Sequence, residues 1–440
     1  MHRVRRAGAV SRDRVLRRFW FSQMLSEIGD WIGLLGIAAL LYAETGQAVY
    51  SAASLAALYF PYLLAPLLVG WCARIPPKTL LIGADLIRGG IVLTLLLPLP
   101  LWALLALTFL ASVPTSVYEA TRAAAVPEYA PDEETQDDAL ALFQSTQQAA
   151  TMCGFLLGGA ALAFVGYQAA IVLNSVSFVL SAIIIVGVPH LPAFSEHNSA
   201  AKLTKAGLQA LRNQVVLRRS VILSVVSASM IMAGEALVVV YGAEISHEGL
   251  AGPLAAITAA TAAFLSIALP RHLNSAHLLR VSQITMLLGG IAAVAIFTLA
   301  PGIFTGFVGY LALGVISAPG ALMYIVAVRE MGPAVRAPVF AVAQVALMCG
   351  QGVVALIAGV LADQIGVGPA IALCQVPVIL VSLFWLLRAT PKATASEQLR
   401  RARVEPRQVV APPESPAPSA IPVASPAAGA PETPALPATH

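Results

Sequence analysis

Twelve runs of mostly apolar residues follow one another along this 440-residue chain. A helix rises about 1.5 Å per residue, so about 20 residues cross the hydrocarbon core of a bilayer. Only 11% of the residues are charged, whereas soluble globular proteins carry about 25%. The sequence therefore predicts an all-α membrane protein with twelve transmembrane helices. We place them near residues 19–42, 50–72, 79–97, 101–121, 138–165, 168–189, 218–243, 249–269, 278–299, 303–328, 337–362 and 367–388.

The distribution of lysine and arginine indicates how the chain crosses the bilayer, because these residues accumulate on the cytoplasmic side. With the basic residues 1–18 in the cytoplasm, the twelve spans bring all 26 lysines and arginines to cytoplasmic segments or the cytoplasmic halves of helices. The opposite connections carry the acidic residues Glu44, Glu244, Glu248 and Asp363. We therefore expect a multi-pass protein of the plasma (inner) membrane with both termini in the cytoplasm.

An internal repeat divides the chain into two parts. The pattern Q-x-A-x-M-C-G occurs at residues 148–154 and again at 344–350. Gly29-Asp30 in the first span has a counterpart in Gly234-Glu235 of the seventh. Repeats in parallel orientation, with a site between them near the bilayer midplane, are typical of one large class of transporters. The pattern predicts two pseudo-symmetric halves of six helices each.

The domain boundaries follow from this repeat and from composition. We expect a basic cytoplasmic N-terminus at 1–18, six-helix halves at 19–189 and 218–388, and a cytoplasmic central loop at 190–217. The loop's second part, from Ala200, is compatible with a short basic interfacial helix. Residues 389–440 are rich in proline and alanine, a composition that predicts a disordered cytoplasmic tail.

Carboxylates inside predicted membrane helices are costly, so each is a candidate functional residue. Glu27 and Asp30 are three residues apart, which brings them to one face of the first helix. Glu235 is the matching acid in the seventh. A carboxyl group in a low-dielectric cavity that water can reach can load and release a proton. We predict that Asp30, Glu235 and Glu27 couple protons or bind substrate; the alternative is that they only tie neighbouring helices together.

Two charged pairs with i, i+3 spacing lie near the cytoplasmic ends of the third and fourth helices. They are Asp85 with Arg88 and Glu119 with Arg122. Arg88 could extend its head group toward the interface. Together with Arg74 and Lys78 in the preceding connection, these pairs could close a cytoplasmic gate in one state and separate in the other. The alternative is a static anchor at the membrane surface.

Glycines in the fifth helix form a further candidate feature. Gly154, Gly158 and Gly159 permit a close approach of helices, and they could also allow this helix to bend. The four cysteines lie in apolar runs without a CxxC pair, so neither a metal site nor a disulfide framework is predicted. No cofactor is expected, because no phosphate-cradling glycine loop and no nucleophile constellation occurs.

The three glycines of helix five belong to a larger set of recognisable segments. The others are residues 26–31 (SEIGDW), Thr45-Gly46, residues 70–78, residues 84–88 (ADLIR) and residues 122–128 (RAAAVPE). In these segments the chain resembles the major facilitator superfamily, in particular its macrolide-exporter and enterobactin-exporter-like branch. The resemblance covers residues 17 to about 388. This resemblance implies the major facilitator fold and efflux of a small compound such as a drug, a macrolide-like or a siderophore-like molecule.

We therefore expect a secondary active transporter that exports a small amphipathic or hydrophobic compound by proton antiport with alternating access. The alternatives are a lysophospholipid or other lipid transporter, or a carrier that takes up a metabolite. A non-transporting receptor would need a large folded extramembrane domain, and an enzyme would need a catalytic constellation. The expected partners are a small-molecule substrate, protons and the lipid bilayer, without nucleic acid, and the expected state is a monomer.

Overall fold

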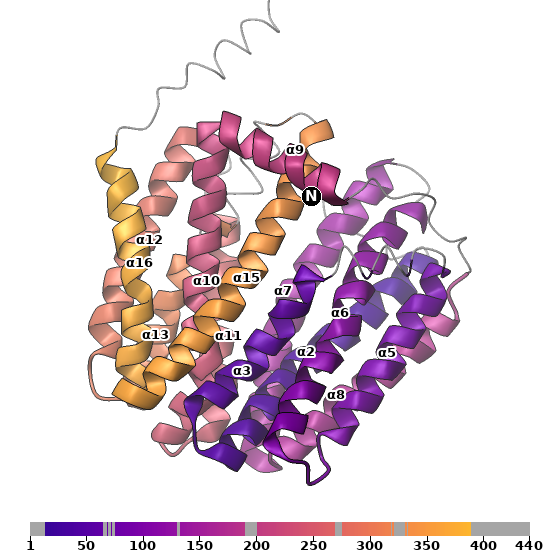
Figure 1. The fold of residues 1–440 in the computed structure, drawn as a ribbon, viewed down its shortest axis with the longest axis horizontal. Coiled ribbons are helices and arrows are strands. Elements are labelled where there is room, and N and C mark those ends of the chain that lie inside the picture. The colour runs from indigo at the N-terminus through magenta and orange to yellow at the C-terminus, as the bar shows by residue number, and fades with distance from the viewer. Residues whose placement is uncertain are drawn as a thin grey trace, which may run out of the picture. The chain divides into compact units, whose positions relative to one another are not determined.

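The protein is helical throughout the part that its structure, a computed structural model, describes. These residues are 14–64, 68, 72, 75–129, 133–189, 200–268, 275–317, 319–320, 331 and 333–388. Figure 1 shows their arrangement. The α-helices are α2 (Arg14–Thr45), α3 (Ala48–Tyr59), α5 (Pro77–Thr94), α6 (Leu101–Tyr129), α7 (Glu133–Phe164), α8 (Tyr167–Val186), α9 (Ala200–Asn213), α10 (Val215–Glu244), α11 (Ala251–Ala268), α12 (Ser275–Phe297), α13 (Ile303–Ile316), α15 (Pro333–Ile365) and α16 (Val367–Leu387). Two short 3-10 helices, η1 (Phe60–Leu63) and η2 (Glu248–Leu250), accompany them.

Each of the twelve predicted spans overlaps one of these helices, and α9 lies between the sixth and the seventh. Helices α3 and α13 end at Tyr59 and Ile316, well before the predicted span ends at residues 72 and 328. Among the described residues, eight helices are long and apolar enough to cross a membrane by length and composition alone. Helix α5 falls short of that criterion because its 18 residues include Lys78, Asp85 and Arg88. Asp85 and Arg88 are nevertheless buried, since they pair with each other inside the protein.

The closest helix packing in the first half joins α2 to α8, which run antiparallel. Gly29, Gly33 and Gly36 line this contact, where added Cβ atoms would collide with Ser177, Asn174 and Ala170 respectively. Small residues at an interface let two helix backbones approach within van der Waals contact. The approach of α8 brings its polar side chains against the middle of α2.

Replacing Gly33 with alanine is expected to lower the thermal unfolding temperature of the purified protein. The added Cβ atom would collide with the side chain of Asn174, from its amide nitrogen to its Cβ atom. Gly83→Ala is the matched control, since nothing lies within 4 Å of a Cβ at Gly83. That second change should be neutral or stabilise by up to about 1 kcal/mol, because alanine is the better helix former. Equal melting shifts in the two variants would contradict the close α2–α8 contact.

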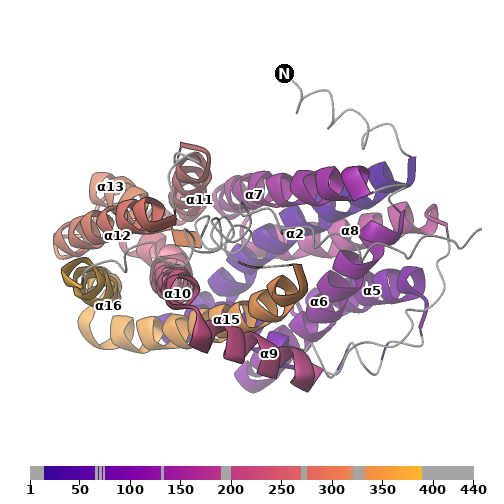
Figure 2. The same ribbon diagram turned by 90° about the horizontal axis from the view of Figure 1, so that it is seen from above.

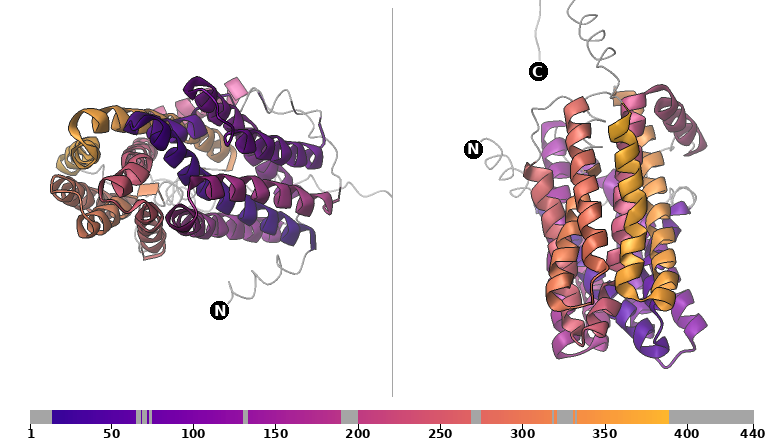
Figure 3. Two further views of the ribbon diagram at one scale, coloured as in Figure 1. Left: turned by 90° about the horizontal axis from the view of Figure 1, so that it is seen from below. Right: turned by 90° about the vertical axis from the view of Figure 1, so that its left-hand side faces the viewer.

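The two halves use the repeated glycine of the Q-x-A-x-M-C-G pattern in equivalent places. Gly154 of α7 abuts Ile28 and Trp31 of α2, the first span, and Gly350 of α15 abuts Ser229 of α10, the seventh span. The repeat in the sequence therefore corresponds to a repeated packing contact. Elsewhere in the second half, helices α12, α13 and α16 lie side by side (Figure 3).

Among the described residues, the two groups of helices share a hydrophobic core toward one end of the bundle. We call the two ends of the bundle the Arg14 end and the Thr45 end, after the first and last residues of α2. Toward the Thr45 end, Leu35 and Leu55 belong to the same buried cluster as Leu237, Leu254 and Ala355 of the second half. At the Arg14 end, the described residues form separate clusters, one around Leu16 and Phe19 and one around Leu217 and Val339.

A carboxylate joins the halves at the Thr45 end. Asp363 of α15 accepts hydrogen bonds from the backbone N–H groups of Ala48 (2.6 Å) and Val49 (3.0 Å), the first residues of α3. The first N–H groups of a helix have no partner within it, and the helix dipole favours an anion there. Gly359, one turn earlier on α15, lets its helix approach the same turn of α3.

Helix α9 packs against the Arg14 end of α15 (Figure 2), where Gly207 lies against the carbonyl of Pro338. Several segments and residues of the sequence-based predictions lie outside the described residues. They are residues 1–13, residues 190–199, the tail at 389–440 and Arg74.

Candidate functional site

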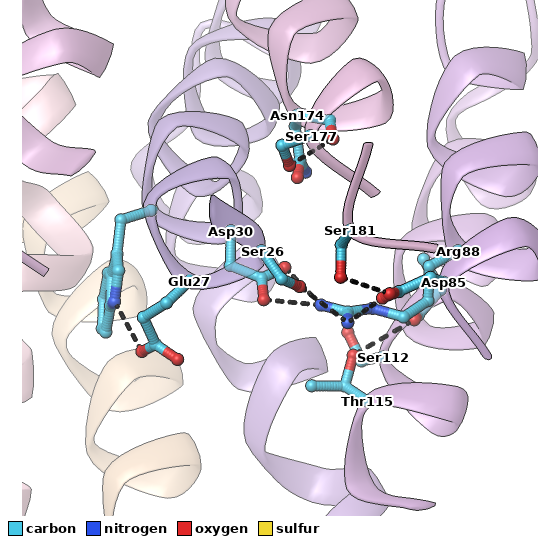
Figure 4. Close-up of polar contacts among 12 residues, drawn as sticks. Ser26, Glu27, Asp30, Asp85, Arg88, Ser112, Thr115, Asn174, Ser177 and Ser181 are labelled. Carbon is cyan, nitrogen blue, oxygen red and sulfur yellow. Dashed lines mark hydrogen bonds and ion pairs between the residues drawn. The ribbon is translucent and has the colours of Figure 1, made fainter. Parts of the chain in front are cut away.

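A buried ion pair lies near the middle of α2. Arg88 of α5 donates from Nη2 to both carboxylate oxygens of Asp30. The arginine is only 2% exposed and the aspartate 27% exposed. Figure 4 shows the guanidinium reaching from α5 toward Asp30. Removing either partner from such a buried pair leaves the other charge uncompensated, which is strongly destabilising.

Further polar groups surround Arg88. Its Nη1 lies 3.4 Å from Asp85 Oδ1 and 3.5 Å from the hydroxyl of Ser26. The guanidinium also lies 4.0 Å from the ring centre of Phe178 and 5.7 Å from that of Tyr118, distances at which an aromatic face attracts a cation. Two carboxylates and two rings therefore hold one cation in the centre of the first half.

Hydroxyl groups continue this network toward the Arg14 end. Ser181 donates to Asp85 Oδ2 over 2.6 Å, and Ser22 lies 2.8 Å from Ser181. The hydroxyl of Tyr118 lies 3.4 Å from that of Ser22. Sequence reasoning singled out neither serine. Serines recur along α2 and along α8, but this pattern indicates a polar network only once the two helices are known to be neighbours.

The arrangement differs from the expected gate in one respect. Arg88 does not extend toward the membrane interface, because Asp30 binds its head group deep in the bundle. Asp85 is likewise fully buried. The residue proposed for coupling and the pair proposed for a cytoplasmic gate are therefore parts of one cluster.

Glu27 lies beside this cluster and bonds to other neighbours. Its carboxylate accepts a hydrogen bond from the indole of Trp31 over 3.1 Å, with Gln147 of α7 at 3.5 Å. Glu27 and Asp30 line one small cavity, as their spacing predicts. Their strongest bonds nevertheless point in different directions, Asp30 toward α5 and Glu27 away from it (Figure 4).

Glu235 occupies the middle of α10 in the second half. It is partly buried, and no ion pair involves it in the part of the chain that the structure describes. The preceding carbonyl, that of Gly234, accepts a hydrogen bond from Tyr310 over 2.8 Å. Tyr59 of α3 lies within electrostatic range of Glu235 and also of Glu27 and Glu119. Tyr59 therefore lies near acids of both halves.

The other charged candidates are distributed over the Arg14 end. Glu119 and Arg122 of α6 line the small cavity that also holds Glu27. Lys78 donates to the carbonyl of Val186 over 2.6 Å, and Arg18 to that of Gly187. Both cations therefore bind the last carbonyls of α8, where the helix dipole favours positive charge. The hydrogen bond of Lys78 thus joins two helices of the first half.

The three glycines of α7 lie at two helix contacts. Gly158 abuts Ile32 of α2, and Gly154 contacts the same helix one turn earlier. Gly159 faces Gly252 of α11, across the boundary between the two halves. A side chain at Gly159 would collide with backbone atoms of both η2 and α11.

The family model of the Major Facilitator Superfamily matches residues 19–328. The chain belongs to the major facilitator superfamily. It is a multi-pass membrane protein and a secondary transporter, not an enzyme. An uncharacterized MFS-type transporter of Bacillus subtilis (strain 168), YfiS, is 24% identical over 392 residues, covering 83% of this chain and 91% of that protein.

Solved transporters share the fold at low sequence identity. The nucleoside transporter NupG matches with a TM-score of 0.66 and 12% identity over 85% of this chain and 98% of its own. A bacterial homologue of the human lysosomal transporter Spinster, inward-facing and occupied, matches with a TM-score of 0.67 and 14% identity over 86% of this chain and 98% of its own. A POT family transporter in complex with 5-aminolevulinic acid matches with a TM-score of 0.65 and 13% identity over 84% of this chain and 95% of its own. These likenesses show the fold alone.

Proposed function

We propose that this transporter exports a small amphipathic or hydrophobic compound in exchange for protons, as a member of the macrolide-exporter and enterobactin-exporter-like branch. The observation that carries the proposal is a carboxyl group in the middle of a helix in each half: Asp30 of α2, bound by Arg88, and Glu235 of α10, without an ion-pair partner among the described residues. These acids come from α2 and α10, the first helix of each half, so each half supplies a carboxyl group that can bind a proton.

Proton exchange needs carboxyl groups whose charge depends on the state of the transporter. Low-dielectric surroundings disfavour the charged form, and a nearby cation favours it. Asp30 has such a cation in Arg88. Glu235 has no ion-pair partner among the described residues. Movement of the halves that changes water access to Glu235, or the contact of Asp30 with Arg88, would change proton binding.

The packing of the two halves fits one state of an alternating-access cycle. We place the Arg14 end in the cytoplasm, because residues 1–18 carry seven arginines and basic residues accumulate on that side. The shared core at the Thr45 end then closes the outer side. Export would proceed as residues 19–189 rock against residues 218–388 and open that end.

Asp363→Ala is expected to favour the state that is open at the Thr45 end, because it removes the cap of α3 that joins the halves. Loss of an N-cap costs about 1 kcal/mol, equal to about a fivefold change in the ratio of two states. Distances between spin labels at Ala43 and Thr298, in a variant without the four native cysteines, would report the change.

Glu44→Ala is the matched control for this measurement, since Glu44 is an exposed acid at the same end of the bundle. It should leave the distance distribution unchanged. If Asp363→Ala also left it unchanged, the hydrogen bonds to α3 would have no part in holding the outer side closed.

Susceptibility profiling tests export itself. A strain that lacks the protein and a strain that overproduces it would be grown against a broad panel of antibiotics, dyes and siderophores. Opposite shifts in the two strains, confined to one chemical class, are expected and would name the substrate class. No shift for any compound would contradict drug-like export and favour a lipid or a metabolite as the substrate.

A further inference from the structure

Two small cavities meet at the ion pair of Asp30 and Arg88. The first, of about 50 Å³, extends toward the Thr45 end and is lined by Ser54, Thr108, Ser112 and Asn174. The second, of about 10 Å³, extends toward the Arg14 end and is lined by Gln23, Glu27, Tyr118, Glu119 and Arg122. Asp30, Arg88 and Thr115 line both.

Each cavity contains a buried amide oxygen that has no hydrogen-bond partner among the described residues. These oxygens are Asn174 Oδ1 in the first cavity and Gln23 Oε1 in the second. Buried polar atoms are almost always bonded to protein or to ordered water. A cavity needs about 10–15 Å³ to hold one water molecule. The first cavity therefore has room for a few waters and the second for about one.

We propose that these two water sites and Asp30 form a proton route through the core of the first half, with Arg88 as its barrier. Waters bound at Asn174 and Ser112 would bring a proton to a carboxylate oxygen of Asp30, which then releases Arg88. Asp30 would pass the same proton to the water at Gln23, next to Glu27. The inference rests on the proposed proton exchange and adds a route through the first half that is separate from Glu235 in the second.

The charges around Asp30 suit this role. Arg88 lines both cavities beside Asp30, and its positive charge repels a hydrated proton. Acceptors lie on the Arg14 side, from which a proton would leave. The titratable groups around Asp30 are Glu27 on α2, Tyr62 in η1, Asp85 and Arg88 on α5, and Tyr118, Glu119 and Arg122 on α6. The cation Arg122 lies on the Arg14 side beside the two acids Glu27 and Glu119. Helix α8 contributes the uncharged Asn174 and Ser181.

Water in the first cavity can be tested on the unaltered protein. X-ray radiolysis in ¹⁸O-labelled water oxidises side chains beside bound water. Phe178 lines the first cavity, and Phe155, equally buried at 1% exposure, lines neither. Phe178 should incorporate ¹⁸O several-fold faster than Phe155. Equal, slow labelling of the two would mean a dry cavity and would overturn the route.

Proton leak tests the barrier. Full-length protein would be placed in liposomes that contain the pH indicator pyranine, with valinomycin and potassium, under a pH gradient and without any transported compound. The wild type should leak no faster than empty liposomes, whereas Arg88→Ala should leak several-fold faster. Arg88→Lys keeps a cation beside Asp30 if the alanine variant fails to fold, and it should leak at an intermediate rate.

A second-site change connects the leak to the first cavity. Ser112→Val should suppress the leak of either Arg88 variant, because it replaces a hydroxyl that lines the route with an apolar group. Ser116→Val, on the same helix and outside both linings, should not. Absence of leak in folded Arg88 variants, or equal leak with both valine changes, would overturn the proposal. These readouts need no substrate, so they hold or fail independently of whether the wild type exports any tested compound.

Discussion

Asp30→Asn is expected to reduce ethidium and erythromycin transport driven by a pH gradient, in liposomes, to the level of protein-free liposomes. Asparagine cannot release a proton, yet its carbonyl oxygen can still accept a hydrogen bond from Arg88. The fold should therefore survive, and exchange of the same compounds without a pH gradient should continue. The comparison of driven transport with exchange separates lost coupling from lost binding.

Glu44→Gln provides the control for this prediction, because it removes an exposed carboxyl group at the end of α2. It should transport like the wild type. Full gradient-driven transport by Asp30→Asn would remove Asp30 from the coupling mechanism and would leave Glu235 and Glu27 as the candidates.

Arg88→Met should strongly destabilise the first half. It leaves the buried Asp85 and the partly buried Asp30 without their shared cation, and breaking a buried ion pair costs about 3–5 kcal/mol. Denaturant unfolding of the purified protein in detergent measures the change. Asp30→Asn combined with Arg88→Met should recover part of the loss, because one of the two uncompensated charges is then absent.

Arg18→Met is the matched control for that measurement. Arg18 is exposed and donates to the carbonyl of Gly187, so its loss should change the stability far less. If the two methionine variants unfolded at the same denaturant concentration, the Asp30–Arg88 pair would not hold the first half together.

Much of the fold could be predicted because the bilayer imposes simple constraints on a sequence. Long apolar runs mark the spans, and the repeat at Gly154 and Gly350 marks equivalent packing positions in both halves. The spacing of Gly29, Gly33 and Gly36 was a further signal of close helix contact that sequence reasoning did not use. Small residues separated by three or four positions form one stripe on a helix.

The site was harder to predict, because its contacts join residues far apart in the chain. Asp85 is three residues from Arg88 and was the obvious partner, whereas Asp30 lies 58 residues away. Local spacing reveals i, i+3 neighbours but not which face of α5 meets α2. The pairing of Asp30 with Arg88 depends on the packing of both helices against α8, which only the structure supplies.

Measurement of proton flux driven by a compound gradient tests proton exchange most directly. Wild-type liposomes that contain pyranine and erythromycin would be diluted into buffer of equal pH without the compound, with valinomycin and potassium present. Proton exchange predicts that the lumen acidifies as erythromycin leaves, and that Asp30→Asn abolishes the acidification. Efflux of erythromycin through the wild type with no change of internal pH would contradict it.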